Sequence, residues 1–464
     1  MDAMTLPRSR YTQGPNFVGR SFAVALSVAL AAATAAGPAA GQDDAGEESA
    51  VQLPSPPETS LTLEESIARA LLVSPTMAQA EGSVRSAEAG RLSAFGAYLP
   101  SINASSNASR ASTNRFNSET NTSVTGSSNS YSAGVSAGVD IWNGGRRGAE
   151  IDDAAAALSA AEATARQRRF DVVLAAKASF YDVLRREELM RVAGARIRRA
   201  QESLTAADRR LQVGTATRSD VLRSRLELND ARQAELTERT AWIVATYTLG
   251  RVVGIDDRVG ATPAEPITVR PLALSPEELR TIVETTSPAV ITAEAGLRSA
   301  DAGVDVARAS YFPSLRASSN LNWFNQELSF EGGNSSWNLA FGVSLPVFNG
   351  FQRESAVTRA RVAADVARFE VRDARRAARV DLERLLGALH LAEERLQLTA
   401  EAVEVAREDL RVQDERYRLG ASTILDLITS QLNLAQAETD EIAARYDYQI
   451  ARAELEALVG RELQ

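Results

Sequence analysis

Residues 131–144 have the sequence Tyr-Ser-Ala-Gly-Val-Ser-Ala-Gly-Val-Asp-Ile-Trp-Asn-Gly, in which apolar and small polar residues alternate up to Ile141. A period of two predicts a β-strand with one apolar face. The alternating stretch has about the 9–11 residues that a tilted strand needs to cross a bilayer. Its second face carries only Ser, Gly and Asp, whereas a soluble core would fill that face with larger side chains. We therefore expect a membrane strand, with an ordinary soluble hairpin as the alternative.

The same pattern returns in residues 337–350, which alternate from Trp337 and end in Phe348-Asn349-Gly350. Other short sequences also occur twice at nearly constant spacing, which indicates a duplicated unit. The matching pairs are Ser74-Pro75 and Ser287-Pro288, Tyr98-Leu99-Pro100-Ser101 and Tyr311-Phe312-Pro313-Ser314, Gly214 and Gly420, Thr217 and Thr423, Asp220 and Asp426, and Gly254 and Gly460. Residues 101–109 and 314–324 are predicted to complete one hairpin per copy, with a Ser/Asn/Thr-rich loop over residues 107–130.

Long helices are expected between these strands and the paired glycines. In the second copy one heptad position is occupied by Leu382, Leu389, Leu396, Val403, Leu410 and Tyr417, and the other by Leu385, Ala392, Thr399, Ala406 and Gln413. This repeat predicts a coiled-coil seam. Asn143 and Asn349 are predicted N-caps, and Gly214 and Gly420 predicted ends, of helices about 100 Å long. Helices over 63–97 and from Thr217 to about residue 250 have half that length, so two of them stacked end to end would match one long helix.

The N-terminus has the layout of a secretory signal peptide, with Arg8, Arg10 and Arg20 before an apolar run and small residues at 39–41. An N-terminal membrane anchor is the alternative, and lipidation is not expected because the chain has no cysteine. The predicted borders are a signal peptide over 1–41, an N-terminal linker over 42–59, a first repeat over 60–254 with its hairpin at about 99–142, a linker in the equatorial region over 255–274, a second repeat over 275–460 with its hairpin at about 312–348, and a C-terminal tail over 461–464.

Composition excludes several classes of function. The 464 residues contain no cysteine and one histidine, His390, so disulfides, thiolate chemistry and Cys- or His-cluster metal sites are not expected. A net charge of −9 argues against a nucleic-acid partner. No Ser/His/Asp arrangement is evident, and we expect neither an enzyme nor a cofactor.

Four strands cannot close a membrane barrel, for which about eight is the minimum, and unpaired edges cannot face lipid. Three copies would supply twelve strands. The expected fold class is mainly α with a transmembrane β-hairpin pair, a duplicated unit that forms a trimeric 12-stranded β-barrel continued by a long α-helical coiled-coil barrel.

The chain resembles the TolC-type outer-membrane efflux proteins over nearly its whole mature length. The matching elements are Leu-Thr-Leu-Glu-Glu-Ser-Ile-Ala-Arg-Ala-Leu at residues 61–71, the repeated Tyr-Leu/Phe-Pro-Ser, the two Asn-Gly turns, and Tyr-Arg-Leu-Gly-Ala-Ser-Thr-Ile-Leu-Asp-Leu at residues 417–427. The resemblance implies a homotrimer in the outer membrane of a Gram-negative bacterium, with a helical tunnel through the periplasm. It also implies a passive duct for tripartite efflux or type I secretion, docked on a periplasmic adaptor protein and an inner-membrane transporter.

The resemblance further implies site residues at the helix tips. Gly214, Thr217, Gly420 and Thr423 would form the tip turns that dock the adaptor, and Asp426, Tyr417 and Asp220 would be pore and gate residues. The family bonds the counterparts of Tyr417 and Asp220, and a carboxylate ring from Asp426 would attract cations. Two positions depart from the family: Ser422 replaces an arginine of some members, and Thr429 replaces a second pore aspartate.

Two alternatives stay open. Asp220 and Asp426 could simply lie on a solvated helix face. The whole chain could instead be a soluble periplasmic coiled-coil adaptor or scaffold of a transport complex, although such a protein has no use for a duplicated hairpin with apolar strands.

Overall fold

The computed structural model describes residues 57–117, 122–263, 272, 274–329 and 331–461. The predicted signal peptide, most of the N-terminal linker, part of the 255–274 linker and most of the C-terminal tail lie outside the described residues. The described chain is mainly helical with a four-stranded sheet, as expected from the sequence. None of its helices combines the length and the hydropathy needed to cross a membrane.

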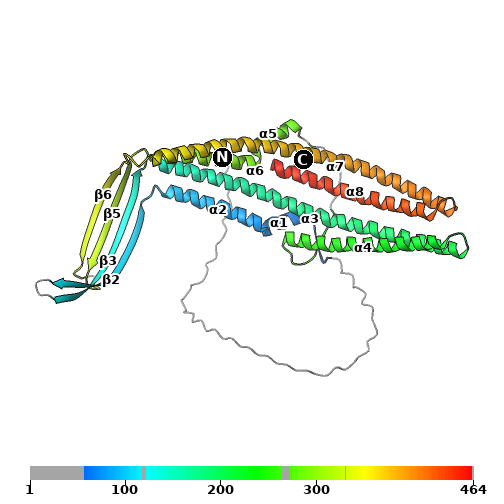
Figure 1. Cartoon of the computed structure of the whole chain (residues 1–464), viewed down its shortest axis with the longest axis horizontal. Helices are drawn as coiled ribbons and strands as arrows, with labels where there is room; N and C mark the ends of the chain where they lie inside the picture. The colour runs from blue at the N-terminus through cyan, green and yellow to red at the C-terminus, as the bar shows by residue number, and fades with distance from the viewer. Residues whose placement is uncertain (1–56, 118–121, 264–271, 273, 330, 462–464) are drawn as a thin grey trace, which may run out of the picture. The chain divides into compact units, whose positions relative to one another are not determined.

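Two helices of 67 residues, α3 (Arg146–Gln212) and α7 (Gln352–Arg418), run the length of the helical part (Figure 1). Each continues through a short turn into a 36-residue helix, α4 (Arg218–Val253) or α8 (Ile424–Val459), which packs back against it. Nearer the sheet, α2 (Pro75–Gly96) packs along α3, and α6 (Pro288–Ala309) packs along both α3 and α7. The half-length helices therefore cover the two halves of each long helix.

The opening helix predicted over 63–97 is divided into α1 (Leu63–Val73) and α2, and α5 (Pro276–Thr286) is divided from α6 at the equivalent place. The division falls at the Ser-Pro pairs because the residue before a proline is pushed out of the helical backbone. Ser74 has ψ 120°, and its Oγ accepts a hydrogen bond from the Met77 amide at 3.3 Å. Ser74 thus ends one helix and caps the next.

The N-caps of the long helices lie two residues after the expected ones, Asn143 and Asn349. The helices start after Gly145 (φ 86°) and Phe351 (φ 62°), and neither of these provides a side-chain cap. The chain turns from strand to helix in left-handed backbone, which glycine adopts readily and phenylalanine does not. The expected N-cap positions were therefore wrong, although the Asn143 Oδ1 accepts a hydrogen bond from the Arg147 amide in the first turn of α3 at 3.3 Å.

A stacked pair of side chains joins each strand end to the start of the long helix. The Arg147 guanidinium lies 4.3 Å from the Tyr98 ring centroid, and that of Arg353 lies 4.9 Å from the Tyr311 ring centroid. Arg147 also donates to the Ile141 carbonyl at 2.9 Å. The two tyrosines are the first residues of the repeated Tyr-Leu/Phe-Pro-Ser. Their stacking on the arginines explains why a tyrosine occupies this position in both copies.

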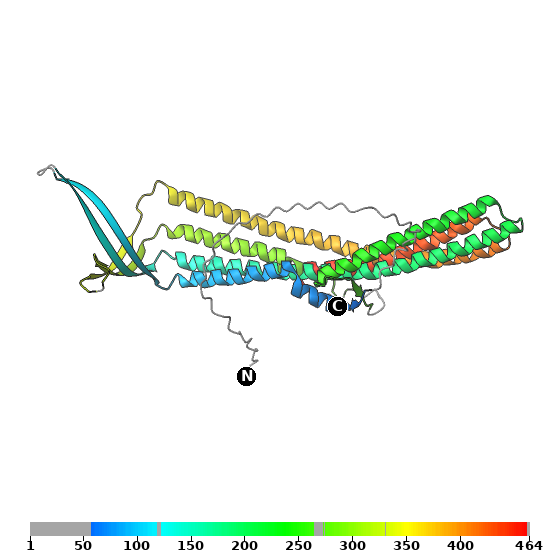
Figure 2. The same ribbon diagram turned by 90° about the horizontal axis from the view of Figure 1, so that it is seen from below.

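The sheet has the order β2 (Ser101–Asn117), β3 (Thr122–Trp142), β5 (Ser314–Asn325), β6 (Asn334–Ser344), with antiparallel neighbours throughout. The loop predicted over residues 107–130 was wrong. β2 and β3 stay paired as far as Asn117 and Thr122, so this hairpin extends past β5 and β6 (Figures 1 and 2). The segment contains no proline, and its serines and threonines can continue a ladder without an apolar face.

Two apolar cores lie where the half-length helices meet. One is built from α5, α7 and α8 around Leu279, Leu382 and Leu455, and the other centres on Phe180, Leu249 and Val259. A parallel pair, β1 (Thr59–Leu61) with β4 (Val259–Ala261), closes the second core. Most of the predicted heptad apolar positions of α7 are buried: Leu382, Leu385, Leu389, Ala392, Val403 and Tyr417.

Candidate functional site

The two helix turns, α3–α4 and α7–α8, have the same hydrogen bonds. Gly214 (φ 75°) donates to the Leu211 carbonyl at 3.0 Å, and the next amide, Thr215, donates to the Arg210 carbonyl at 2.8 Å. The equivalent bonds at Gly420 (φ 77°) measure 3.1 and 2.8 Å. This is the Schellman arrangement, which satisfies the last helical carbonyls and reverses the chain. Gly214 and Gly420 therefore lie at the turns where the sequence predicted them.

Each turn passes directly into a capping box. Thr217 donates from its amide (2.9 Å) and hydroxyl (2.8 Å) to the Asp220 carboxylate, and Thr423 makes the same two bonds to Asp426. The backbone hydrogen bond from Thr423, followed by its hydroxyl, holds the pKa of Asp426 below its ordinary value. Both aspartates thus secure the start of the returning helix, a task that the sequence analysis did not give them.

The structure does not bring Tyr417 and Asp220 together. The Tyr417 ring is buried at the end of α7 against Ile424, Leu427 and Ile428. Within the described chain the Tyr417 hydroxyl has no hydrogen bond to Asp220, whose carboxylate is engaged by Thr217. Ser422, at one departure from the family, donates from its hydroxyl to the Gln413 carbonyl at 3.4 Å.

The strand register separates the sheet into two chemically different faces, because residues directly opposite each other share a face. One face is apolar, with Ile102, Ala104, Ala133, Val135, Val139, Leu315, Leu321, Trp323, Trp337, Leu339, Phe341 and Val343. The other carries Asn103, Ser105, Ser132, Gly134, Ser136, Gly138, Asp140, Arg316, Ser318, Asn320, Asn322, Asn338, Ala340, Gly342 and Ser344. The alternation predicted for residues 131–141 and from Trp337 onward is therefore present, and the apolar face is interrupted by Ser106, Ser319 and Ser335.

Aromatic residues mark both ends of the apolar face. Tyr131, Trp323 and Trp337 lie near the outer end by register, and Trp142 packs edge-to-face on Phe312 at the helical end, with ring centroids 6.0 Å apart. A register irregularity after Asp140 places Trp142 opposite Leu315, on the apolar face. About 11 residues at ~3.3 Å each, tilted by ~40°, span about 28 Å, which is close to the ~25 Å apolar band of a membrane sheet.

The polar face holds one opposed charge pair. Arg316 and Asp140 lie opposite each other with a nitrogen–oxygen distance of 3.7 Å. Glycines make room for the long side chains: a Cβ at Gly138 would approach the Arg316 guanidinium to 3.2 Å, and one at Gly134 would meet Asn322 Oδ1 at 2.6 Å. Apart from Phe324, which lies opposite Ser132 near the outer end, the other polar-face residues given above have small or amide side chains.

Residues 66–254 and 282–461 match the profile of the family described as "Outer membrane efflux protein". The chain belongs to this family. It is 28% identical over 414 residues to the pyoverdine export outer membrane protein OpmQ of Pseudomonas aeruginosa, covering 86% of this chain and 83% of OpmQ. It is also 28% identical over 424 residues to Protein CyaE of Bordetella pertussis, covering 88% and 85% of the two chains.

Solved structures support the fold. The CmeC outer membrane channel of Campylobacter jejuni has a TM-score of 0.74 at 18% identity, covering 87% of this chain and 86% of CmeC. CusC has a TM-score of 0.75 at 17% identity, covering 86% and 92%. These likenesses concern the fold. Because the chain belongs to the outer membrane efflux protein family, we take it as an outer-membrane channel that extends into the periplasm, and the soluble-scaffold alternative is not supported.

Sequence reasoning missed one residue at the tip of this outer membrane efflux protein. Arg210, in the last turn of α3, lies over the Tyr417 ring with 3.9 Å between its guanidinium carbon and the ring centroid. It also donates to the Tyr417 carbonyl at 2.5 Å and the Arg418 carbonyl at 3.2 Å. The available signal was a difference between the copies, because Leu211 occupies the position equivalent to Tyr417.

Polar contacts continue along the seam between α3 and α8. From the tip inward they are Ser203 with Gln431 (3.0 Å), Arg199 with Glu438 (3.5 Å), Glu188 with Tyr446 (2.9 Å), and Lys177 with Glu456 (2.7 Å). Burial, followed by the Glu188 charge, raises the pKa of Tyr446, so its hydroxyl stays protonated and donates. At the inner part of this seam, Ile442 and Tyr446 of α8 also pack with Phe180 of α3 in an apolar core. The seams within each helical hairpin combine apolar clusters with polar pairs such as Arg196–Glu227 (2.9 Å).

Proposed function

We propose that three copies of this chain form a passive duct that exports substrates across the periplasm and the outer membrane. The observation that carries the proposal is the four-stranded sheet, with one apolar face and a single neighbour for each of β2 and β6. Unpaired strand edges are too costly to expose to lipid, and four strands are too few to close on themselves. Three sheets joined edge to edge would form a 12-stranded barrel with the apolar face outward.

The helices support the same assembly, because α7 carries a second apolar stripe that α8 does not cover. Its exposed members, seven residues apart, are Leu391, Leu398, Val405, Val412 and Leu419. α4 exposes a different apolar stripe that includes Leu222, Leu226, Leu236, Val244 and Tyr247. A contact between two unlike faces of identical chains is heterologous and generates a ring when it closes.

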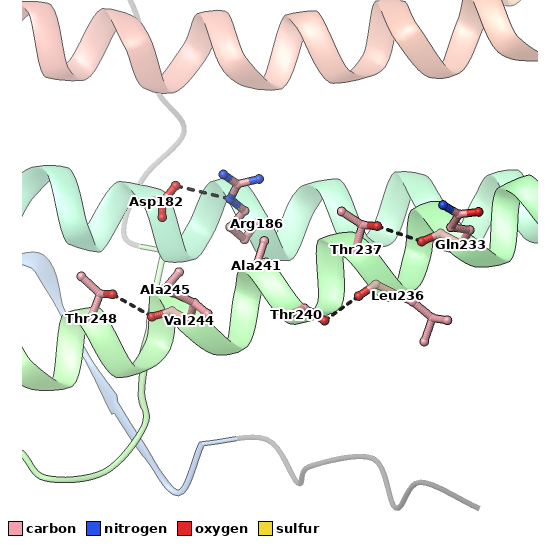
Figure 3. A pocket seen from close by; sticks show the side chains of 10 residues that line it. All are labelled: Asp182, Arg186, Gln233, Leu236, Thr237, Thr240, Ala241, Val244, Ala245 and Thr248. Atoms are coloured by element: carbon pink, nitrogen blue, oxygen red, sulfur yellow. Dashed lines mark hydrogen bonds and ion pairs between the residues drawn. The ribbon is translucent and has the colours of Figure 1, made fainter.

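A groove of ≈ 640 Å³ is lined by residues of α3 and α4 and includes Leu236 and Val244 of the exposed α4 stripe (Figure 3). Its threonine hydroxyls are already used within α4: Thr240 donates to the Leu236 carbonyl at 2.9 Å, and Thr248 donates to the Val244 carbonyl at 2.8 Å. The groove therefore offers mainly apolar surface between Asp182 and Arg186 at one side and Gln233 at the other. We propose that the exposed α7 stripe of the next copy packs along this surface.

At the tips, Gly214, Thr217, Gly420 and Thr423 would present the turns that dock a periplasmic adaptor, with an inner-membrane transporter as the driving partner. The fixed hydrogen bonding of both turns and the exposure of Val213 (73%) and Leu419 (82%) favour such a role. We propose Tyr417, Asp220 and Asp426 as pore and gate residues. In a trimer Asp426 would contribute three carboxylates, which favour cations.

Relatives differ in the cargo that their names state, which includes pyoverdine for OpmQ and toluene for TtgC of Pseudomonas putida. We propose that the transporter selects the cargo and that this chain conducts it without enzymatic activity.

The test is the mass and the conductance of the full chain purified from the outer membrane. Sedimentation in detergent should give the mass of three chains, and planar bilayers should show channels. A monomer whose sheet remains intact by circular dichroism would contradict the proposal, as would recovery of the chain in the soluble periplasmic fraction.

A further inference from the structure

Arg210 connects the two helical hairpins at their tips. It belongs to α3, and its three contacts are all with the last turn of α7: the Tyr417 ring, the Tyr417 carbonyl and the Arg418 carbonyl. The final carbonyls of a helix carry negative partial charge, and the Tyr417 carbonyl accepts from Arg210 in addition to the Gly420 amide of its own turn. A cation placed over the buried ring and between these carbonyls is therefore held by several attractions at once.

The duplicated counterpart does not make this connection. Arg416 occupies the position equivalent to Arg210, and its guanidinium donates to the Ala421 carbonyl at 3.4 Å, within its own turn. The equivalent of Tyr417 is Leu211, which offers no aromatic face. The two tips have the same backbone, so the cross-contact depends on the Arg210–Tyr417 pair and not on the turn.

The part of the α3–α8 seam nearest the tip, which Arg210 closes, is suited to separation, whereas its inner part is held by the apolar core that joins Phe180 of α3 to Ile442 and Tyr446 of α8. Nearer the tip, Ser203 bonds to Gln431 and Arg199 to Glu438, and such polar groups can exchange partners for water when the hairpins part. Within each hairpin, apolar residues such as Leu228 and Ile428 hold the two helices together. The hairpins can therefore move as units.

We propose that Arg210 is a gating residue of the duct: it holds the α7–α8 hairpin against α3 in the closed state, and it must leave the Tyr417 ring and the two carbonyls when the tip opens. This rests on the proposed function, because it assumes that the tips narrow the duct.

The decisive partner is the Tyr417 ring and its backbone, not its hydroxyl. Tyr417→Phe keeps the aromatic face and should preserve the closed tip. Tyr417→Leu, which copies the first repeat, should weaken it. An equal effect of Phe and Leu would show that the hydroxyl holds the tip, and would overturn the proposal.

The absence of native cysteine allows a direct distance measurement. Spin labels at Val213→Cys and Leu419→Cys, in trimers diluted with unlabelled chains, would report the separation of the two turns by double electron–electron resonance. Arg210→Gln should shift the distribution to longer distances and raise the resting conductance. Loss of a charged contact shifts an equilibrium by about tenfold or more, and three copies act together.

Arg416→Gln is the matched control, since it removes the same charge from the equivalent position, and it should leave both measurements near wild type. Arg210→Lys keeps the charge but not the planar fork and should give an intermediate result. The proposal is overturned if Arg210→Gln leaves distance and conductance unchanged, if Arg416→Gln has the same effect, or if lysine substitutes fully.

Wild-type conductance separates this inference from the proposed function. A wild-type chain that forms no trimer or no channel refutes the duct itself. A conducting trimer in which Arg210→Gln changes neither the distance between the turns nor the resting conductance refutes the gating role alone. Trimer yield and circular dichroism of each variant confirm folding, and the Tyr417 pair provides a second route if Arg210→Gln fails to assemble.

Discussion

At the helix turns, glycine is required by the backbone conformation and not by crowding. Gly214 and Gly420 have positive φ, and a Cβ at either position would meet no atom within 4 Å. The cost of a side chain is then the left-handed conformation alone, about 1–2 kcal/mol.

Gly214→Ala and Gly420→Ala should therefore each lower the free energy of unfolding by about 1–2 kcal/mol. Gly148→Ala is the control, because Gly148 lies within α3, also in open space, and has ordinary helical backbone. It should stabilise the chain by about 0.5–1 kcal/mol. Denaturant titration of the refolded protein measures all three. A loss of several kcal/mol at either turn would mean that the glycine also makes room for a neighbour.

Asp426 predicts a pH dependence of the second tip. Because Thr423 lowers the folded-state pKa of Asp426, the carboxylate stabilises the turn above the unfolded pKa of about 3.9, and this contribution is lost as pH falls through the lower folded value. Asp426→Asn should therefore alter single-channel conductance and cation preference at neutral pH, and the variant and wild type should converge once the pH falls below the lowered folded-state pKa of Asp426. A difference that persists unchanged at low pH would exclude the carboxylate charge as its cause.

At the level of strands and helices, the predictable parts are those with a strong period. Alternation indicated β3 and β6, and heptads indicated α7, because one buried face imposes a pattern on the sequence. Residues 110–130 lack such a face, so nothing in their sequence distinguishes a projecting ladder from a loop. The N-caps were misplaced because two residues in left-handed backbone, Gly145 and Phe351, stand between the predicted caps and the helices, although the Asn143 side chain still accepts from the Arg147 amide.

Charge on the apolar face of β6 should block assembly. Leu339→Arg or Phe341→Arg would place a guanidinium against hydrocarbon at about 2–4 kcal/mol per site, three times in a trimer. Asn338→Arg and Ala340→Arg, on the polar face, are the matched controls and should be milder. Trimer yield from outer membranes is the measurement, and equal tolerance on both faces would refute the lipid-facing assignment.

For the whole molecule, local sequence cannot reveal contacts between the two copies. Arg210 and Tyr417 are separated by 207 positions, and Lys177 and Glu456 by 279. Duplication predicts that equivalent residues have equivalent surroundings, whereas these pairs join unlike positions. Family resemblance directed attention to the helix tips and to Tyr417, but the arginine that lies over the Tyr417 ring became visible only in three dimensions.

The Arg316–Asp140 pair leads to a prediction about the ion selectivity of the assembled barrel. The two residues lie opposite each other on the polar face of β3 and β5, and their opposite charges cancel. Arg316→Gln should leave three uncompensated carboxylates in the trimer and increase cation preference, whereas Asp140→Asn should increase anion preference. Reversal potentials in a salt gradient measure both. Shifts of the same sign, or no shift in either variant, would contradict a luminal position for the pair.

Because α3 is one continuous helix from Arg146 to Gln212, a small tilt at its middle produces a larger displacement at its end. The pivot is the packed core around Phe180. From there α3, with α4 packed against it, extends to Gln212, about 48 Å away at ~1.5 Å per residue. A tilt of about 5° at the pivot would displace the end of α3 by about 4 Å, given that length. A displacement of this size is longer than the hydrogen bonds that Arg210 donates to the Tyr417 and Arg418 carbonyls. A small tilt at the core would therefore be enough to break these bonds at the tip.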